Sequence, residues 1–308
     1  GGKLAGADLT ESILTGCTMT GADLTGASLK HTTVEGGDWG RAVFKGAHML
    51  GVRFVRVALA GADFEGAELK AAAFLRAEMA GARFTRANLD RAVLGDVDLG
   101  GADLGGADLS FATLLKADLR TTRLTGARFY ATTLMEANLA GVDLSSQSLR
   151  STIFSSADVS GARFDGADMA KCNFTKANLE RASFDKAVAD NTLFIEATLT
   201  DAKLRGASLK QALFPKSDLA NADLTQANLH QAFFADAKCR GARFTGSDLT
   251  YADFSRADLT EAGFVGATFG RTKLHRAKLA GAKFSDKAGT LGDDQDLAEA
   301  ETWNRGAA

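Results

Sequence analysis

Proline is almost absent from this sequence of 308 residues, which contains a single proline beside 33 glycines. Irregular loops ordinarily use both residues, because proline presets φ for a turn and glycine supplies positive φ. The imbalance indicates that the glycines recur at one structural position instead of serving many unrelated loops. We therefore expect an internal repeat.

An excess of charge of one sign is also missing, as are long apolar runs. Lysine and arginine number 36 against 38 aspartates and glutamates, which leaves a net charge of −2. This balance gives no electrostatic basis for direct nucleic-acid binding. No run of 18 apolar residues exists that could span a bilayer, so we expect no membrane span. The overall composition is typical of a soluble globular protein.

Cysteine is scarce, and Cys17, Cys172 and Cys239 form no CxxC pair. They are most simply small core hydrophobes. Reduced cysteines suit a cytoplasmic compartment, and secretory or transit signatures are missing, so we expect a cytoplasmic protein. The chain opens Gly1-Gly2-Lys3 without an initiator methionine, so we expect its start to be processed or cut from a longer chain.

A large apolar residue, here called a centre, recurs every five positions from Leu4 to Phe284 without insertion or deletion. Only Ala189 and Cys239 lack a large side chain at a centre. The residue two positions before each centre is small, and Gln147 alone breaks that rule. Both positions must therefore face inward.

A period of five matches neither the 3.6 residues of a helix nor the two of a flat strand. The chain must therefore turn in every repeat, and the second position after the centre, as at Gly61 and Gly66, supplies the corner. Most of the 20 phenylalanines fall in two classes of centre that lie ten residues apart within a period of twenty. This pattern predicts a coil with four walls, in which opposite walls carry phenylalanine and stack ring on ring.

We number the walls 1 to 4 by their first centres, Leu4, Leu9, Leu14 and Met19. The repeat predicts about 14 coils, and a spacing of roughly 4.8 Å between stacked strands gives a rod on the order of 65 Å long.

Units such as Ala22-Asp23-Leu24-Thr25-Gly26 resemble the A(D/N)LXX motif of pentapeptide-repeat proteins, and the resemblance covers residues 2–286. It implies an all-β fold, a right-handed quadrilateral parallel β-helix. Members of that family include bacterial DNA gyrase inhibitors that mimic DNA and confer quinolone resistance, uncharacterised cytoplasmic and lumenal proteins, and repeat domains of secretion or signalling proteins. The family resemblance therefore predicts the fold but not the function.

We expect two parts, a β-helix over residues 1–286 and a tail over residues 287–308. The tail reads as a short capping helix with an acidic start. Its Leu297, Ala300 and Trp303 would cover strand edges that are left unpaired at the end of the coil stack.

The sequence gives little sign of catalysis. His31, His48, His230 and His275 occupy outward positions far apart in the chain, without a set of metal-ligand spacing. We interpret the glycine-rich stretches as corners of the coil and not as phosphate-binding loops. The many aspartates recur at the position before the centre, so they reflect the repeat and not a catalytic pair. A rod filled with leucine and phenylalanine offers no cleft in which to shift a pKa, so we expect no enzyme, cofactor or metal site.

Two outward surfaces are candidates for function. Wall 4 is the more acidic, and Asp98, Asp118 and Asp158 are its candidate residues for a DNA mimic. Basic residues intrude on it, and wall 1 alternates in sign from coil to coil, as at Asp63 and Arg83, which cancels its field.

The second surface, which we call the apolar stripe, follows wall 3 and the corner beside it. Strand propensity alone explains part of it, but a contiguous apolar stripe is typical of a docking surface. Its candidate residues are Leu75, Phe111, Leu115, Tyr130, Met135, Ile153, Leu193, Ile195, Leu213 and Phe233.

Three functions compete. The leading hypothesis is a non-enzymatic structural module, a rigid rod that docks a protein partner or a second copy through the apolar stripe. The second is a DNA-mimicking inhibitor of DNA gyrase, and the third is a repeat domain of a larger secreted or secretion-linked protein.

Two of the exceptions to the repeat, Ala189 and Gln147, lead to further structural expectations. Ala189 should leave a void, a water site or a local slip that turns Val188 inward. The Gln147 amide, at an inward position, should find a backbone partner or a water, because an unpaired buried amide costs about 1–3 kcal/mol.

Overall fold

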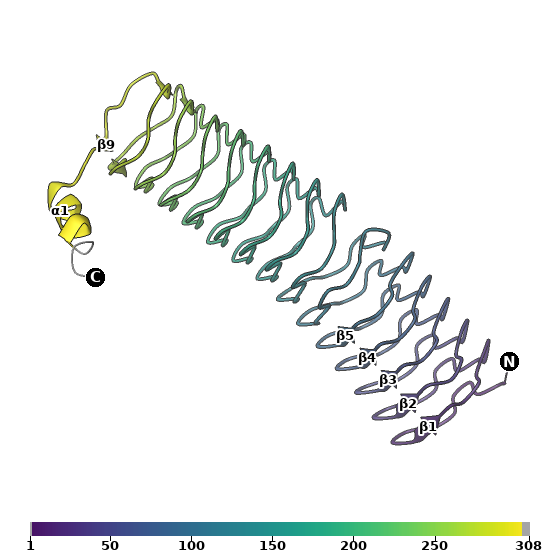
Figure 1. Cartoon of the computed structure of the whole chain (residues 1–308). Coiled ribbons are helices and arrows are strands. Elements are labelled where there is room, and N and C mark those ends of the chain that lie inside the picture. The colour runs from purple at the N-terminus through teal and green to yellow at the C-terminus, as the bar shows by residue number, and fades with distance from the viewer. Residues whose placement is uncertain (1, 304–308) are drawn as a thin grey trace.

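A computed structural model describes residues 2–303 of the chain. It shows a parallel β-solenoid of about 14 turns, drawn out into a rod with the termini at opposite ends (Figure 1). Parallel bridges join most residues before a centre to the residue twenty positions later, as in Asp23 with Val43 and Val43 with Asp63. The expected four-walled β-helix is therefore confirmed.

Regular strands are short and lie mainly on wall 3. Strands β1 (Ile13–Thr15), β2 (Thr33–Glu35), β3 (Arg53–Val55), β4 (Ala73–Leu75) and β5 (Val93–Gly95) form one parallel sheet in chain order. Near the other end, β6 (Gly263–Phe264) pairs with β8 (Lys283–Phe284), and β7 (Thr272–Lys273) pairs with β9 (Thr290–Leu291). Helix α1 spans Gln295–Trp303.

Stacked rings fill the shaft, as the phenylalanine pattern predicts. On wall 1 the Phe44 and Phe64 rings lie 4.8 Å apart and nearly parallel, and Phe64 and Phe84 repeat this at 4.7 Å. Phe54 on the opposite wall meets Phe64 edge-on, with centroids 6.2 Å apart. Such offset and edge-to-face arrangements suit the charge distribution of aromatic rings.

The corners share one backbone conformation. Every second position after a centre, from Gly6 to Gly281, has positive φ, with Thr121 as the exception. Glycine adopts this conformation freely, yet other residues also occupy it, for example Arg86 with φ of 59°. The turns are therefore imposed by the stack as a whole and not by glycine alone.

The solenoid keeps its register through Ala189, which is buried. Val188 is 41% exposed, so the alternative of a local slip that turns it inward is wrong. The Ala189 N–H donates to the carbonyl of Ser208 in the next coil at 2.7 Å. Cross-coil hydrogen bonding therefore holds the backbone in place although the centre is small.

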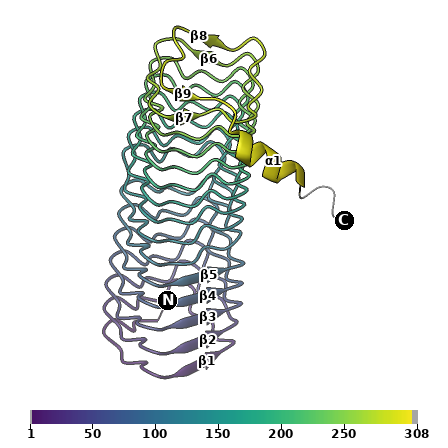
Figure 2. The ribbon, with the colours of Figure 1, turned by 90° about the vertical axis from the view of Figure 1, so that its left-hand side faces the viewer.

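The tail covers the end of the solenoid with a strand and not with the expected capping helix. Strand β9 pairs with β7 and covers the edge of wall 3, and α1 lies against the side of the last coils (Figure 2). Leu297 and Ala300 remain exposed, so the pairing of β9, and not their burial, covers this edge. The side chain of Trp303 lies outside the described residues. In residues 2–303, no helix has both the length and the apolarity needed to cross a membrane.

Candidate functional site

The apolar stripe is brought together by the coil stack. Except for Phe111 and Tyr130, its residues lie on wall 3 in two columns, one before and one after the centres. Leu193, Leu213 and Phe233 are consecutive rungs of the first column, linked by parallel bridges. Residues twenty positions apart therefore become neighbours, as the repeat predicts.

Exposure varies along the stripe. Leu115, Met135 and Phe233 are 39%, 38% and 36% exposed, and the other wall 3 members are half-buried. The polar rung of Asn173 lies between Ile153 and Leu193. The stripe therefore has two apolar segments separated by a single polar coil.

Phe111 and Tyr130 form an aromatic pair at the corner between walls 2 and 3. Their rings meet edge-on with centroids 5.4 Å apart, and they are 46% and 50% exposed. The Arg91 guanidinium lies 4.8 Å from the centre of the Phe111 ring. Aromatic and arginine side chains in such a cluster are typical of binding hot spots.

The acidic candidates on wall 4 do not form one continuous surface. Asp98 pairs with Glu78, but no bridge joins it to Asp118 in the next coil. Asp118 is paired with Arg120 at 2.7 Å, and the hydrogen bond from Arg120 holds the pKa of the carboxyl below its usual range. The Asp158 carboxylate accepts from the Asn178 amide at 3.1 Å. Much of the negative charge is therefore compensated locally.

Opposite charges on wall 1 are paired as the alternating ladder predicts. Arg83 lies 3.2 Å from Asp63, and Arg243 lies 2.8 Å from Asp223. Each pair joins neighbouring coils and neutralises its own field.

Cysteine and histidine positions follow the expectations except at His275. Cys172 and Cys239 are buried, and burial raises the pKa of the Cys172 thiol to about 12. His275 is buried too, contrary to the outward position expected, because the tail covers it and the Asp294 N–H donates to its Nδ1 at 3.1 Å. Within residues 2–303, no three potential metal ligands lie close enough to hold an ion.

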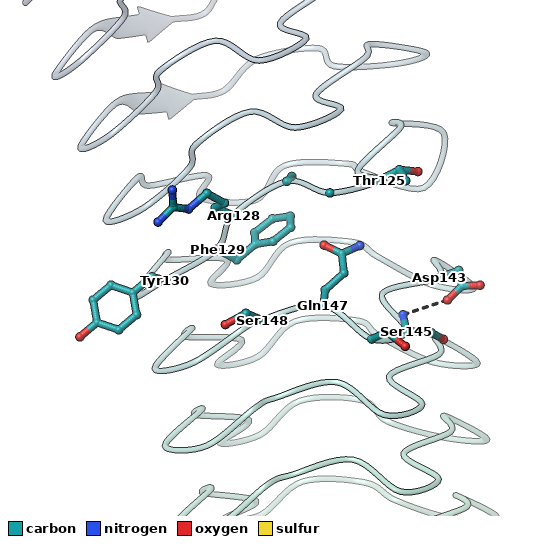
Figure 3. Close-up of a pocket in the computed structure, with 11 residues that line it drawn as sticks. Thr125, Arg128, Phe129, Tyr130, Asp143, Ser145, Gln147 and Ser148 are labelled. Atoms are coloured by element: carbon teal, nitrogen blue, oxygen red, sulfur yellow. Dashed lines mark hydrogen bonds between the residues drawn. The ribbon is translucent and has the colours of Figure 1, made fainter.

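A cleft of about 780 Å³ opens in the middle of the rod, where the repeat predicts closed coils (Figure 3). It lies on walls 1 and 2, between residues 121–130 and 141–150, which no backbone hydrogen bond joins. Figure 1 shows the even spacing of the coils interrupted in this region. The lining residues are Thr125, Gly126, Ala127, Arg128, Phe129, Tyr130, Asp143, Ser145, Ser146, Gln147 and Ser148.

Gln147 accounts for the position of the cleft. Threonine is tolerated at the same inward position, since Thr152 is short enough to donate to the Phe129 carbonyl at 2.6 Å. Gln147 is longer, and its buried Oε1 has no hydrogen-bond partner in the structure. Of the two expected partners, a backbone group is therefore wrong at Oε1, and a water stays a prediction. The sequence signal for the cleft was the single break in the small-residue rule.

Several proteins of known structure are similar to this chain in fold. One is HetL, a pentapeptide repeat protein from the cyanobacterium Nostoc sp. strain PCC 7120, with 24% identity, coverage of 92% of this chain and 91% of that one, and a TM-score of 0.23. Full-length QnrB1, a plasmid-mediated fluoroquinolone resistance protein, is 16% identical over 96% of this chain and 97% of its own, with a TM-score of 0.25. A search of curated protein sequences found no match.

The family described as pentapeptide repeats (8 copies) matches nearly the whole chain. The matched segments are residues 3–38, 40–74, 68–106, 87–126, 102–141, 127–166, 172–211, 202–238, 227–263, 237–276 and 252–286. Together with the unbroken five-residue register and the four-walled coil, these matches establish that the chain belongs to the pentapeptide repeats family.

Proposed function

We propose that this protein is a non-enzymatic binding module, a rigid rod that docks a protein partner or a second copy through the apolar stripe. The observation that carries the proposal is the line of outward apolar side chains on wall 3, with Leu115, Met135 and Phe233 each more than a third exposed. Apolar side chains aligned on one face are typical of interaction sites.

The solenoid suits this role because its shape is fixed by its interior. Side chains at the centres are buried along the shaft, so the outward columns keep a constant spacing from coil to coil. A partner that matches this spacing binds a preorganised surface and loses little of its affinity to reordering of the rod. The corner cluster of Arg91, Phe111 and Tyr130 would anchor one side of the interface.

Lysine substitutions test the proposal. The triple variant Leu115→Lys, Leu193→Lys and Phe233→Lys should keep the circular dichroism spectrum of the wild type, because outward side chains do not fill the shaft. Self-association measured by light scattering, or partner capture measured by pull-down, should be lost.

A matched control adds the same charge elsewhere. Lysine at Thr25, Thr200 and Thr245 lies away from wall 3 and should leave both readouts unchanged. Normal binding by the wall 3 variant would show that the stripe reflects strand propensity alone. Loss of binding by both variants would point to an effect of net charge instead of a specific surface.

A further inference from the structure

We propose that the cleft between residues 121–130 and 141–150 binds an extended peptide segment, which enters as an additional β-strand between the two coils. The site lies on walls 1 and 2, and Tyr130 at the corner is the one residue that its lining shares with the apolar stripe. It is therefore a second binding site, distinct from the wall 3 part of the proposed docking surface.

The lip formed by residues 121–130 presents unpaired backbone donors. In the preceding coil, Leu104 N–H and Leu109 N–H donate to carbonyls in the next coil, at 2.9 and 2.8 Å. The equivalent N–H groups of Leu124, Gly126 and Phe129 make no such bond. They therefore form a row of donors without partners, as at a free strand edge.

The lip formed by residues 141–150 presents the complementary groups. The carbonyls of Asp143, Ser145 and Ser148, which the regular ladder would pair with those donors, accept no backbone hydrogen bond. The N–H groups of Asp143 and Ser148 are unpaired as well. A strand placed between the lips could exchange backbone hydrogen bonds with both, which is the basis of recognition by β-strand addition.

The cleft is closed on its far side, which gives it a wedge shape. On walls 3 and 4 the neighbouring coils stay joined, through Leu119 N–H to the Asn138 carbonyl at 2.8 Å and Leu134 N–H to the Ile153 carbonyl at 2.7 Å. The opening is confined to walls 1 and 2, where each lip is two pentads long. A peptide of two pentads therefore matches the length of the site.

The interior of the cleft adds chemical selectivity. Gln147 points into the gap toward the Phe129 ring, and Tyr130 points away from it (Figure 3). The buried Gln147 Oε1 and Ser145 Oγ both lack partners. An inward peptide residue that carries a donor, such as serine or threonine, would remove the cost of these unpaired groups, while an apolar residue would pack on Phe129.

A labelled decapeptide with the sequence Gly-Ala-Asp-Leu-Gly-Gly-Ala-Asp-Leu-Ser is a suitable probe, because residues 101–110 of the chain occupy the same two walls with this sequence. Binding is measured by fluorescence anisotropy and by hydrogen exchange at the amides of Leu124, Gly126 and Phe129. We expect these amides to exchange quickly in the free protein and at least about tenfold more slowly with bound peptide. A peptide with proline in place of both leucines lacks two donors and should not bind.

Substitutions at Gln147 and at a control position test whether peptide binding depends on the cleft. Gln147→Ala restores a small inward residue, so the coils should close, the three amides should become protected without peptide, and peptide binding should be lost. Gln211→Ala changes an exposed corner glutamine outside the cleft and should bind like the wild type. The triple lysine variant of wall 3 should also retain peptide binding.

Two results would overturn the inference. Slow exchange at Leu124, Gly126 and Phe129 in the free wild type would mean that the coils are closed in solution. Fast exchange without any peptide-induced protection or anisotropy change up to millimolar peptide would mean that the cleft is open but is not a strand-binding site.

Discussion

Aspartate before a centre serves the turn that follows it. The Asp23 carboxylate accepts from the Thr25 N–H at 3.0 Å, whereas the N–H groups of Leu24 and Gly26 donate to carbonyls of the next coil. The side chain thus satisfies the one N–H of the unit that makes no backbone hydrogen bond. On wall 4, Asp98 makes the same bond to Gly100 at 2.8 Å. The acidic character of that wall is therefore accounted for by the turns.

Replacing Ala189 with leucine should stabilise the protein. Ala189 is buried in the column of Met169 and Leu209, where a larger centre would add packing contacts worth about 1–3 kcal/mol. We expect a higher midpoint of thermal unfolding by circular dichroism. Ala187→Leu is the matched control, because it enlarges the neighbouring small position and should lower the midpoint. An unchanged midpoint for Ala189→Leu would mean that the surrounding coils have already filled the space.

Gly37 is a position where the fold demands glycine. Its φ is +86°, and an added Cβ would lie 2.1 Å from the Cys17 carbonyl oxygen. Gly37→Ala should therefore cost more than about 2 kcal/mol, since the clash is with backbone. The adjacent Gly36 also has positive φ, but a Cβ added there would meet no atom within 4 Å beyond its chain neighbours. Gly36→Ala should cost only about 1 kcal/mol, and equal losses in urea denaturation would contradict this explanation.

Helix α1 is held to the solenoid mainly through one carboxylate. Glu301 lies 2.7 Å from Arg276 and 2.8 Å from Arg256, and its Oε2 lies 3.6 Å from Nε2 of the buried His275. The Arg276 guanidinium also donates to the Ala298 carbonyl at 2.9 Å. The helix is short, so its stability depends on these contacts with the coils.

Glu301→Gln should therefore loosen α1 without weakening the solenoid. Hydrogen exchange should become faster over residues 295–303, and the main unfolding midpoint should stay unchanged, because the centres of the coils are untouched. Glu299→Gln provides the control, since Glu299 is exposed and its carboxylate makes no ion pair among the described residues. Equal acceleration in both variants would assign the effect to net charge and not to the contact with arginine.

The rod as a whole presents different chemistry on different walls, and this separates the two leading functions. The hypothesis of a gyrase-directed DNA mimic depends on Asp98, Asp118 and Asp158, whereas the docking proposal depends on wall 3. If the chain inhibits gyrase, Asp98→Asn, Asp118→Asn and Asp158→Asn together should abolish inhibition of DNA supercoiling, and the wall 3 lysine variant should retain it. The proposed docking function predicts the reverse sensitivity for partner binding or self-association, with loss only in the wall 3 variant.

The sequence by itself determined which side chains point into the shaft and which point outward, because the repeat is local and uninterrupted. Once every fifth residue fills the shaft, each outward position has a fixed wall and a fixed neighbour twenty residues away. The column of Leu193, Leu213 and Phe233, and the ion pairs of wall 1, therefore follow from the repeat alone.

Tertiary structure decided the features that depend on contacts between coils or with the tail. Gln147 could be recognised as an exception, but whether its amide finds a partner depends on the room between two complete coils. The separation of those coils leaves its Oε1 buried and unpaired. His275 occupies an outward position of the repeat, yet the returning tail buries it, because β9 pairs with β7 and brings Asp294 and Glu301 alongside. Cross-coil hydrogen bonds and the packing of the tail are cooperative, so no single five-residue unit encodes them.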